Sequence, residues 1–373
     1  MIKVLYNALH LTGQFSGVQY IVEQLMKEAF FSPVENIHFE AICPADYEPD
    51  ISIPSSQKMT NIPVNTSTRW KRIGYEHLFM QNYFNKQNKH ILHCPAYIQP
   101  WNWKGLSVIT VHDIIALDYP EYCSFTNRLY FKLVLPRSIL NASKIITMSY
   151  AVKNDILNKF NINPDKIEVI YPGIDDVFRI DSTVEKLNNV RHRYQLPEKF
   201  ILYVGNIEPK KNIVRLIRSF NNLTRQIDIP HSLVIAGRFA WKYKDVLQET
   251  DKLINKRILL PGYIDRADLP TLYSLADLFI FPSLYEGFGI PPLESMACGT
   301  PVIVSNRGAL PEIAGKCALI VDPFSIDSMT AAMKELLLNQ TLKEQLIING
   351  KRHVQQFRWN EAWSSTAKLY NSL

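Results

Sequence analysis

The 373-residue sequence has no uninterrupted apolar stretch of the roughly 18 residues that a membrane-spanning helix needs. Its start, MIKVLYNALHLTG, carries one lysine, and the apolar run there is too short for the core of a signal peptide. Cysteine is scarce, and none of the five cysteines has the CxxC spacing of zinc or redox sites. They are Cys43, Cys94, Cys123, Cys298 and Cys317. We expect a protein that is not integral to a membrane and that works in a reducing cytoplasm.

Two ligand-binding motifs are absent as well. Neither half of the chain has the GxGxxG fingerprint after its first apolar segment, which disfavours a dinucleotide-dependent oxidoreductase. The turn TGQFSG near the start contains Gly13 and Gly17, but at a different spacing. No Asp-x-Asp pair follows a predicted strand, so we expect no bound metal.

The composition is that of an ordinary globular protein, with 47% hydrophobic and 20% charged residues. Single hydrophobic cores rarely extend over 373 residues, so two domains are expected. Short runs rich in Val and Ile alternate with longer amphipathic segments, a pattern typical of βαβ units around a parallel sheet. The predicted fold class is α/β with two Rossmann-like domains.

The predicted strands fall into two series. The first series covers residues 4–9, 39–43, 90–94, 107–111, 144–149 and 167–171. A polar stretch over residues 175–199 follows and predicts a linker and a helix. The second series covers residues 200–205, 231–237, 258–263, 278–283, 301–305 and 318–323. In the helix after this series, Asp327 or Ser328 is the expected N-cap.

The most informative stretch is PSLYEGFGIPPLESMACGTPVIVS, residues 282–305. A strand is predicted to end at Pro282 and Ser283 and a helix to open near Pro291 or Pro292, because proline is favoured in the first helical turn. The bare N–H groups of a helix start at the carboxyl end of a strand suit a phosphate. Gly287 and Gly289 would let the backbone approach such a ligand closely.

Two carboxylates bracket this turn, Glu286 before it and Glu294 in the helix. Carboxylates beside a phosphate site can accept hydrogen bonds from sugar hydroxyls. The alternative is structural: Glu286 as a loop residue and Glu294 as a favourable charge near a helix N-terminus.

These residues resemble the E-x7-E signature of retaining glycosyltransferases with the GT-B fold, most closely glycosyltransferase family 4. Further matches occur in the family's order: VHDI (111–114), YPGIDDVF (171–178), VGNIEPKKN (204–212), IAGR (235–238), PGYI (261–264) and ALPEIAG (309–315). The resemblance implies two Rossmann-like domains facing a central cleft. Their implied bounds are 1–175 for the acceptor-binding domain and 176–357 for the donor-binding domain. Residues 358–373 would form a helix that returns to the first domain.

The resemblance also implies roles for residues at the donor site. Glu286 would contact the donor sugar's hydroxyls and Glu294 the ribose. The backbone amides of Gly287, Phe288 and Gly289 would meet the donor phosphates. Arg238 of IAGR and Tyr263 of PGYI are further donor-binding candidates.

The segment GNIEPKKN places Lys210 and Lys211 in a strand-to-helix turn. Departure of a nucleoside diphosphate builds negative charge on its oxygens, so fixed cations there would stabilise the transition state. Lys211 matches the family's lysine, whereas Lys210 stands where similar sequences often carry arginine. Without the surrounding motifs, a solvated lysine pair in a surface turn would be the better interpretation.

In the first half, the resemblance singles out Gly17 and His112. Gly17 opens a helix start, GVQY, that similar enzymes turn toward the donor phosphates. His112 directly follows a predicted strand in SVITVHDI and would orient donor or acceptor near the transferred sugar. We do not assign it as the general base, and Asp113 beside it is a weaker candidate.

The predicted function is retaining, metal-independent and cofactor-independent transfer of a hexose from a nucleotide-sugar to a glycan or lipid-linked acceptor. GDP-mannose is favoured as donor by resemblance to bacterial polysaccharide enzymes. A noncatalytic nucleotide-sugar-binding subunit is the alternative.

Charge is uneven along the chain, which carries a net charge of +6. Residues 58–104 combine cations with aromatic rings, and Glu76 is their one acidic residue. The cations are Lys58, Arg69, Lys71, Arg72, Lys86, Lys89 and Lys104. The aromatic residues include Trp70, Tyr75, Phe79, Tyr83, Phe84, Trp101 and Trp103. No nucleic-acid motif is present, so the pattern predicts either peripheral contact with an anionic membrane or an ordinary solvated face.

Overall fold

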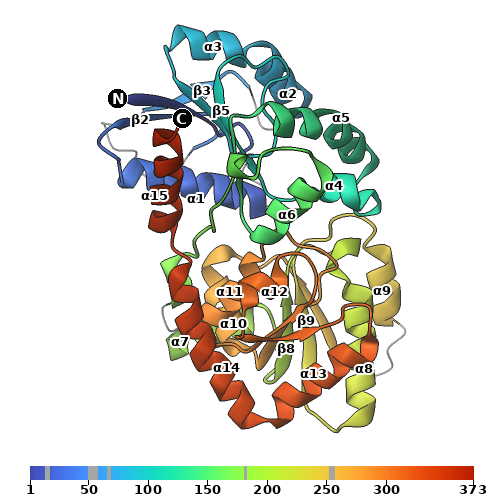
Figure 1. The fold of residues 1–373 in the computed structure, drawn as a ribbon. Coiled ribbons are helices and arrows are strands. Elements are labelled where there is room, and N and C mark those ends of the chain that lie inside the picture. Colours follow the sequence, from blue (N-terminus) through green and yellow to red (C-terminus); the bar gives the residue numbers. More distant parts are fainter. Residues whose placement is uncertain (13–16, 49–57, 65–68, 180–182, 252–256) are drawn as a thin grey trace. The chain divides into compact units, whose positions relative to one another are not determined.

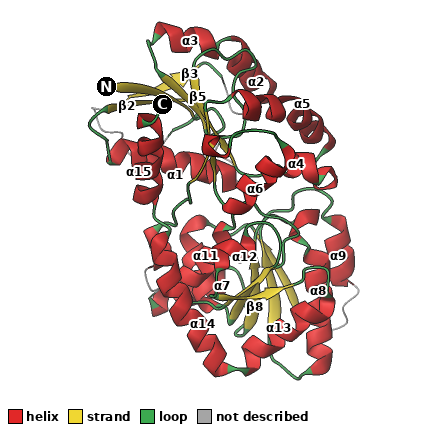
Figure 2. Ribbon diagram, in the orientation of Figure 1, coloured by secondary structure: helices red, strands yellow, loops and turns green. Residues whose placement is uncertain are grey.

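A computed structural model describes residues 1–12, 17–48, 58–64, 69–179, 183–251 and 257–373. The chain forms two compact units. The N-terminal unit comprises Met1–Gly173 together with Phe357–Leu373, and the C-terminal unit comprises Ile174–Gln356. Figure 1 traces the chain from blue at the N-terminus to red at the C-terminus. Both units have the α/β architecture predicted from the sequence, with helices packed around parallel strands (Figure 2).

The N-terminal unit contains a seven-stranded parallel sheet in the order β3-β2-β1-β4-β5-β6-β7. Its strands are β1 (Ile2–Asn7), β2 (Ile37–Pro44), β3 (Lys58–Ile62), β4 (Ile91–Cys94), β5 (Leu106–Val111), β6 (Lys144–Thr147) and β7 (Ile167–Val169). The strand order reverses direction between β1 and β4. In open α/β sheets, ligands bind beyond the carboxyl ends of the strands at such a switch point.

The edge strand β3 was not predicted from the sequence. Its residues, KMTNI, include only one that is fully buried, so they lack the apolar run that marks the other strands. The strand forms because its backbone pairs with β2, in a register that sets Lys58 opposite Glu40. This pairing depends on a neighbouring strand rather than on local composition.

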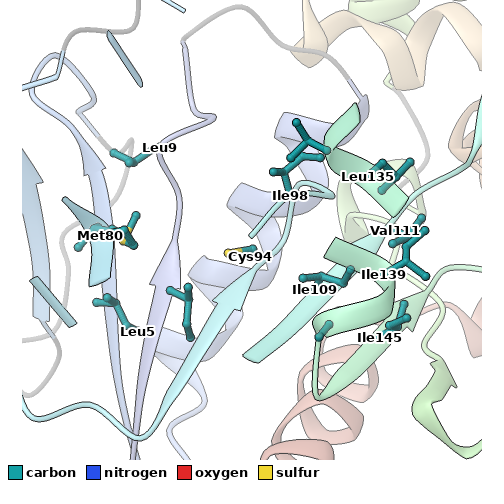
Figure 3. Close-up of a cluster of buried hydrophobic side chains, with 14 of the residues drawn as sticks. Leu5, Leu9, Met80, Cys94, Ile98, Ile109, Val111, Leu135, Ile139 and Ile145 are labelled. Atoms are coloured by element: carbon teal, nitrogen blue, oxygen red, sulfur yellow. The ribbon is translucent and has the colours of Figure 1, made fainter. Parts of the chain in front are cut away.

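Helices surround this sheet and complete its core. They are α1 (Gly17–Phe31), α2 (Arg69–Leu78), α3 (Met80–Lys86), α4 (Ile115–Asp118), α5 (Phe125–Asn141) and α6 (Tyr150–Lys159), with 3-10 turns at Pro120–Tyr122 and Pro164–Lys166. Figure 3 shows part of the core, in which Leu5, Ile109 and Ile145 from three strands lie in one cluster with Leu135 and Ile139 of α5.

The C-terminal helix α15 (Trp359–Asn371) belongs to the N-terminal unit, as the sequence predicted. Its Trp363 ring packs against Phe39 of β2, and the Trp363 indole donates a hydrogen bond to the Ser32 carbonyl at 2.7 Å. Tyr370 hydrogen-bonds to His93 on β4. Buried aromatic side chains therefore hold the last helix against a sheet whose strands come from the first half of the sequence.

The C-terminal unit contains a six-stranded parallel sheet in the order β10-β9-β8-β11-β12-β13. Its strands are β8 (Phe200–Val204), β9 (Ser232–Ala236), β10 (Ile258–Gly262), β11 (Leu278–Phe281), β12 (Val302–Ser305) and β13 (Ala318–Val321). All six lie where the sequence predicted strands. Here the switch point falls between β8 and β11.

The helices of the C-terminal unit are α7 (Val184–Arg193), α8 (Ile213–Gln226), α9 (Lys244–Asp251), α10 (Leu269–Leu275), α11 (Ile290–Ala297), α12 (Leu310–Ala314), α13 (Ile326–Leu338) and α14 (Gln340–His353). Short 3-10 turns cover Asp176–Arg179, Pro209–Lys211, Arg266–Asp268 and Val354–Gln356. Among the described residues, no helix is both long and apolar enough to cross a lipid bilayer.

The predicted N-cap of α13 was wrong. Ser325, rather than Asp327 or Ser328, caps this helix, and its hydroxyl accepts a hydrogen bond from the Ser328 amide at 3.1 Å. The hydroxyl of Ser328 instead accepts from the Asp322 amide. Several short polar residues here can each cap a helix, and the path of the preceding turn selects among them.

Candidate active site

The strongest cluster of candidate residues lies at the switch point of the C-terminal unit. Lys210 and Lys211 form the 3-10 turn that follows β8, and Glu286 lies in the loop that follows β11. Because β8 and β11 are adjacent parallel strands, their carboxyl ends bring these two segments together. The Leu284 amide donates to the Lys210 carbonyl at 2.8 Å, which ties the two loops at the backbone.

The side chains of this cluster form an ion-paired group. The Lys211 ammonium donates a hydrogen bond to Glu286 Oε1. Lys210 Nζ lies 3.8 Å from Glu286 Oε2 and 4.0 Å from Glu208 Oε1. Lys211 also lies over the Phe281 ring, 5.0 Å from its centre, so the end of β11 supports the cation as well. The structure thus brings together three of the predicted site residues.

Glu286 is charged at neutral pH because of this pairing. Burial by itself would raise the pKa of the Glu286 carboxyl, but Lys211 and Lys210 outweigh burial and lower it. The Glu286 and Lys211 side chains are each only 12% exposed, so water screens their attraction weakly. A fixed carboxylate and two fixed cations therefore lie within one small region.

Gly308, which the sequence analysis did not single out, holds the backbone of Glu286 in place. Its φ is +56°, and a Cβ there would lie 2.4 Å from the Glu286 carbonyl oxygen. The Ala309 amide donates to that same oxygen at 2.9 Å. Only glycine fits this approach, so the loop after β12 fixes the loop after β11. The glycine directly precedes the ALPEIAG motif, which was its only signal in the sequence.

The helix α11 begins at Ile290, directly after Gly289 and just before the predicted start at Pro291 or Pro292. Gly289 has φ +123°, a conformation that L-residues rarely adopt, and Pro291 and Pro292 occupy the first turn. Gly287 and Phe288 are buried in the loop that leads into this helix. The loop has the strand-to-helix form expected of an anion site, and the phosphate role of these residues stays a prediction.

Glu294 lies on the buried face of α11, and the residue is only 4% exposed. Tyr273 donates a hydrogen bond to Glu294 Oε2 at 3.0 Å, and Arg266 Nη1 lies 3.9 Å from Oε1. Burial raises the pKa of Glu294 to about 7, although Arg266 and Tyr273 act in the opposite direction. Arg266 itself donates to Asp175 at 2.6 Å. The carboxyl is thus poised to change its charge near neutral pH.

Arg238 and Tyr263 form a separate pair on the same edge of the sheet. The Arg238 guanidinium lies over the Tyr263 ring, 4.2 Å from its centre. Arg238 follows β9 and Tyr263 follows β10, whereas Lys211 follows β8. The carboxyl ends of adjacent strands therefore carry a cation–π pair and the Lys–Glu cluster. The donor-binding roles of Arg238 and Tyr263 stay predictions.

In the N-terminal unit, His112 follows β5 as predicted and is 6% exposed. Its Nε2 lies 2.7 Å from the Pro95 carbonyl, so this nitrogen carries the proton. Burial lowers the pKa of His112, and its buried Nδ1 has no hydrogen-bond partner among the residues that the structure describes. A neutral imidazole with a free acceptor nitrogen can receive a hydrogen bond from a hydroxyl.

The neighbouring candidates have different surroundings. Asp113 accepts hydrogen bonds from the Ile115 amide at 3.1 Å and from the Tyr97 hydroxyl at 3.2 Å, which is a structural use of its carboxylate. Gly17 opens α1, and a Cβ there would meet nothing within 4 Å. Gly13 lies outside the described residues.

The predicted patch over residues 58–104 is not one solvated face, because several of its members are buried. Lys89 is buried in an ion pair with Glu40 at 2.6 Å, and Lys58 reaches the same carboxylate at 3.2 Å. Phe84 belongs to the core, and Trp103 packs against its ring. The exposed members include Trp70, Lys71, Phe79, Lys86, Trp101 and Lys104.

Comparison with known proteins identifies the family. A family model described as Glycosyltransferase Family 4 matches residues 36–178, and one described as Glycosyl transferases group 1 matches residues 186–353. O-antigen chain mannosyltransferase B of Escherichia coli is 32% identical over 287 residues, which cover 76% of this chain and 74% of that protein. Serotype-specific mannosyltransferase WbdA of Escherichia coli is 29% identical over 280 residues, 74% of this chain but only 33% of WbdA.

Solved structures share the fold at lower identity. Sucrose-phosphate synthase from Thermosynechococcus elongatus matches with a TM-score of 0.76 at 20% identity, covering 100% of this chain and 99% of that one. HepE from Anabaena in complex with UDP-glucose matches with a TM-score of 0.73 at 16% identity, covering 100% of both chains. These likenesses confirm the predicted GT-B fold. Together with the sequence matches, they show that the chain is a glycosyltransferase and belongs to glycosyltransferase family 4.

Proposed function

We propose that the chain transfers mannose from GDP-mannose to a glycan or lipid-linked acceptor in the synthesis of a cell-surface polysaccharide. The observation that carries this proposal is the Lys211–Glu286 pair, with Lys210 beside it, at the switch point of the C-terminal unit. The mannosyl donor is supported by the name of the Escherichia coli relative, an O-antigen chain mannosyltransferase. A nucleotide-sugar as donor is supported by the UDP-glucose complex of HepE.

In the proposed reaction, the bond between the anomeric carbon of mannose and the diphosphate oxygen breaks, and that oxygen keeps the electron pair. The acceptor hydroxyl oxygen bonds to the anomeric carbon from the same face, so the configuration is retained. Its proton passes to the departing diphosphate. Lys211 and Lys210 stabilise the charge that develops on the diphosphate, and Glu286 accepts hydrogen bonds from sugar hydroxyls.

The remaining candidates have binding and positioning roles in this proposal. Glu294 accepts hydrogen bonds from the ribose, while Arg238 and Tyr263 contact the nucleotide. The amides of the 287–289 turn and Gly17 approach the phosphates. His112 accepts a hydrogen bond from a hydroxyl through its Nδ1, which no other described residue contacts by a hydrogen bond. No protein nucleophile is needed.

We also propose that the reaction needs no metal, because the two lysines and the start of α11 supply the positive potential. Transfer from GDP-mannose should proceed at the same rate with and without EDTA.

Proton NMR of the product should show an α-linked mannose, the anomeric configuration of the donor. A requirement for Mg²⁺ or Mn²⁺ that is restored by adding the ion would contradict the metal-independent proposal, and a β-linked product would contradict retention. UDP-glucose in place of GDP-mannose is the control for donor choice.

The acceptor is proposed to lie at an anionic membrane, which the protein contacts peripherally from the cytoplasmic side. The exposed face of α5 supports this, since Phe125, Leu129 and Leu133 recur at a helical spacing of four and are 77%, 51% and 60% exposed. Exposed cations, Arg128 and Lys132, lie beside them on the same helix. Apolar side chains flanked by cations suit insertion among anionic lipid headgroups.

The start of α2 lies next to this face. Arg69 of α2 donates a hydrogen bond to Asn127 of α5 at 2.5 Å, and both helices lie in the upper part of Figure 1. Trp70 is 68% exposed, and the Arg137 guanidinium stacks over Trp101. The predicted membrane contact therefore moves from residues 58–104 as a whole to a face formed by α5, the start of α2 and Trp101.

The wild-type protein should float with vesicles containing anionic lipid at low ionic strength and be released by salt. The double variant Leu129→Asp/Leu133→Asp should remain in solution, because it places charge where side chains would enter the headgroup region. Leu338→Asp, at a 63% exposed position in α13, is the matched control and should float like wild type. Equal flotation of all three proteins, or none by wild type, would contradict the membrane contact.

A further inference from the structure

The proposed reaction uses the Glu294 carboxyl but gives no role to the arginine and the aspartate that adjoin it. The chain passes from the N-terminal unit to the C-terminal unit after Gly173, and Asp175 is the second residue beyond this crossing. Arg266 lies in the 3-10 turn that precedes α10, and Glu294 lies on α11. A set of charged contacts within the C-terminal unit therefore links the crossing segment to the carboxyl that we assign to the ribose.

Arg266 is shared between the two carboxylates. Its Nη2 donates a hydrogen bond to Asp175 Oδ2 at 2.6 Å, whereas its Nη1 lies 3.9 Å from Glu294 Oε1, which is too far for a hydrogen bond. The side chains of Asp175, Arg266 and Glu294 are 21%, 32% and 5% exposed. Asp175 therefore holds the arginine directly, and Glu294 receives its attraction over a longer distance.

Packing fixes the arginine in this shared position. Its guanidinium lies over the ring of Phe178, 5.5 Å from the centre, and Phe178 is fully buried. The Phe178 ring packs edge-to-face against Tyr273, the residue that donates a hydrogen bond to Glu294. The Phe178 carbonyl accepts a hydrogen bond from Cys298 Sγ, directly after α11. The turn that follows Asp175 thus contacts both the tyrosine and the helix that position the Glu294 carboxyl.

The chain on either side of Asp175 is closely held. A Cβ on Gly173 would lie 2.3 Å from the Trp359 amide nitrogen, so only glycine fits against the start of α15. On the other side of the crossing, Arg179 donates a hydrogen bond to the Val354 carbonyl at 3.1 Å. Asp175 therefore lies in a short segment between two held points, where a change of backbone torsions would move its carboxylate relative to Arg266.

The neighbours of Glu294 act on it with opposite signs. Burial raises the pKa of Glu294 to about 7, the charge of Arg266 and the hydrogen bond from Tyr273 lower it, and the charge of Asp175 raises it. Lys351 of α14, which also packs against α11, lies instead against the turn after that helix. Asp175 both repels the ionised carboxylate and holds the arginine that would stabilise it.

We propose that Arg266 is a positioning residue shared between the crossing and the ribose site, through which Asp175 controls the charge on Glu294 and thereby the affinity for nucleotide. While Asp175 holds Arg266, the Glu294 carboxyl keeps its proton more readily and has less capacity to accept hydrogen bonds from the ribose. Movement of Asp175 away from Arg266 leaves the arginine to Glu294, which then ionises. Because coupling is reciprocal, bound nucleotide favours this second arrangement. The proposal deepens the proposed function and rests on it for the ribose contact.

The first test follows the Glu294 carboxyl in the protein without nucleotide. Its titration is measured by ¹³C NMR of the glutamate carboxyls, with Glu294→Gln to identify the signal. Asp175→Asn should move the midpoint to lower pH, and Arg266→Gln should move it to higher pH. Asp176→Asn is the matched control and should leave the midpoint unchanged, because Asp176 pairs with Arg179 at 3.0 Å and its side chain is 82% exposed.

GDP affinity, measured by titration calorimetry, gives a second readout that a merely structural role would not produce. Arg266→Gln should weaken GDP binding at least about twofold at pH 7, where fewer carboxyls are ionised, and less than about twofold at pH 9, where nearly all are ionised. Asp175→Asn should tighten GDP binding at pH 6. Arg266→Lys keeps the positive charge and should resemble wild type, which covers the case of an Arg266→Gln protein that does not fold.

The outcomes separate this coupling from the proposed function. Unchanged midpoints in Asp175→Asn and Arg266→Gln, or an equal shift in Asp176→Asn, overturn the proposal. An equal loss of GDP affinity at pH 7 and pH 9 also overturns it, since Arg266 would then be a structural support. The NMR titration requires neither nucleotide nor transfer. Opposite shifts in a protein that transfers no mannose would therefore refute the proposed function and leave the control of Glu294 by Asp175 standing.

Discussion

Glu286→Gln and Lys211→Ala should each lower the turnover of the nucleotide-sugar by about 10² to 10³, the usual cost of losing a fixed group that stabilises transition-state charge. In Lys211→Ala, the diphosphate departs without its principal cation, and the buried Glu286 loses its direct partner. In Glu286→Gln, the amide keeps the shape of the side chain but one of its two acceptor oxygens becomes a donor. Initial-rate kinetics with GDP-mannose should show the loss mainly in kcat.

The pairing of these two residues gives the experiment a second readout. Because their charges are coupled, the double variant Glu286→Gln/Lys211→Ala should cost less than the product of the two single effects. Lys316→Ala is the control. Lys316 is exposed and lies just before β13, at the amino end of this edge strand, whereas Lys211 and Glu286 follow the carboxyl ends of β8 and β11. Near wild-type turnover in both single variants would place the active site elsewhere.

Glu294 should make nucleotide binding depend on pH near neutrality. Its pKa is raised to about 7, so about one carboxyl in ten is ionised at pH 6 and about nine in ten at pH 8. If the ionised form accepts both ribose hydroxyls, GDP affinity should rise roughly tenfold between these pH values. Glu294→Gln should remove most of this dependence, as measured by titration calorimetry. A wild-type affinity that is flat with pH would contradict the ribose assignment.

The same carboxyl affects stability in the opposite direction. Its folded-state pKa lies above the unfolded value, so the folded state holds this proton more tightly. The contribution to stability is complete below about pH 4 and is lost as pH rises through 7. Glu294→Gln should therefore raise the melting temperature relative to wild type at pH 8 more than at pH 5. Stability and GDP affinity would then respond oppositely to pH, which distinguishes a functional buried acid from a merely tolerated one.

Much of the fold could be predicted from the sequence because its signals are local. The apolar runs of the second half all became strands, since each buried parallel strand must be apolar on both faces. The residues between Glu286 and Glu294 also predict the local structure, because a glycine turn followed by two prolines favours the start of a helix. Glu286 therefore lies in the loop and Glu294 on α11.

Features that depend on a neighbour could not be predicted in this way. The strand β3 exists through pairing with β2, and the Ser325 cap depends on the path of the turn before it. Residues 58–104 read as one basic and aromatic face, but tertiary packing buried Lys89 against Glu40 and left Trp70 outside. The sequence alone does not distinguish a charged residue that is buried in an ion pair from one that is exposed to water.

By itself, the sequence determined the α/β class, the order of most strands along the chain, the E-x7-E turn and, through resemblance, the glycosyltransferase family. Only the tertiary structure decided which polar side chains share an environment. It paired Lys211 with Glu286, placed Tyr273 and Arg266 against Glu294, and gathered Arg72 and Glu76 beside His10. The physical reason is that strand order sets which carboxyl ends are adjacent, and burial there, rather than residue type, sets charge and pKa.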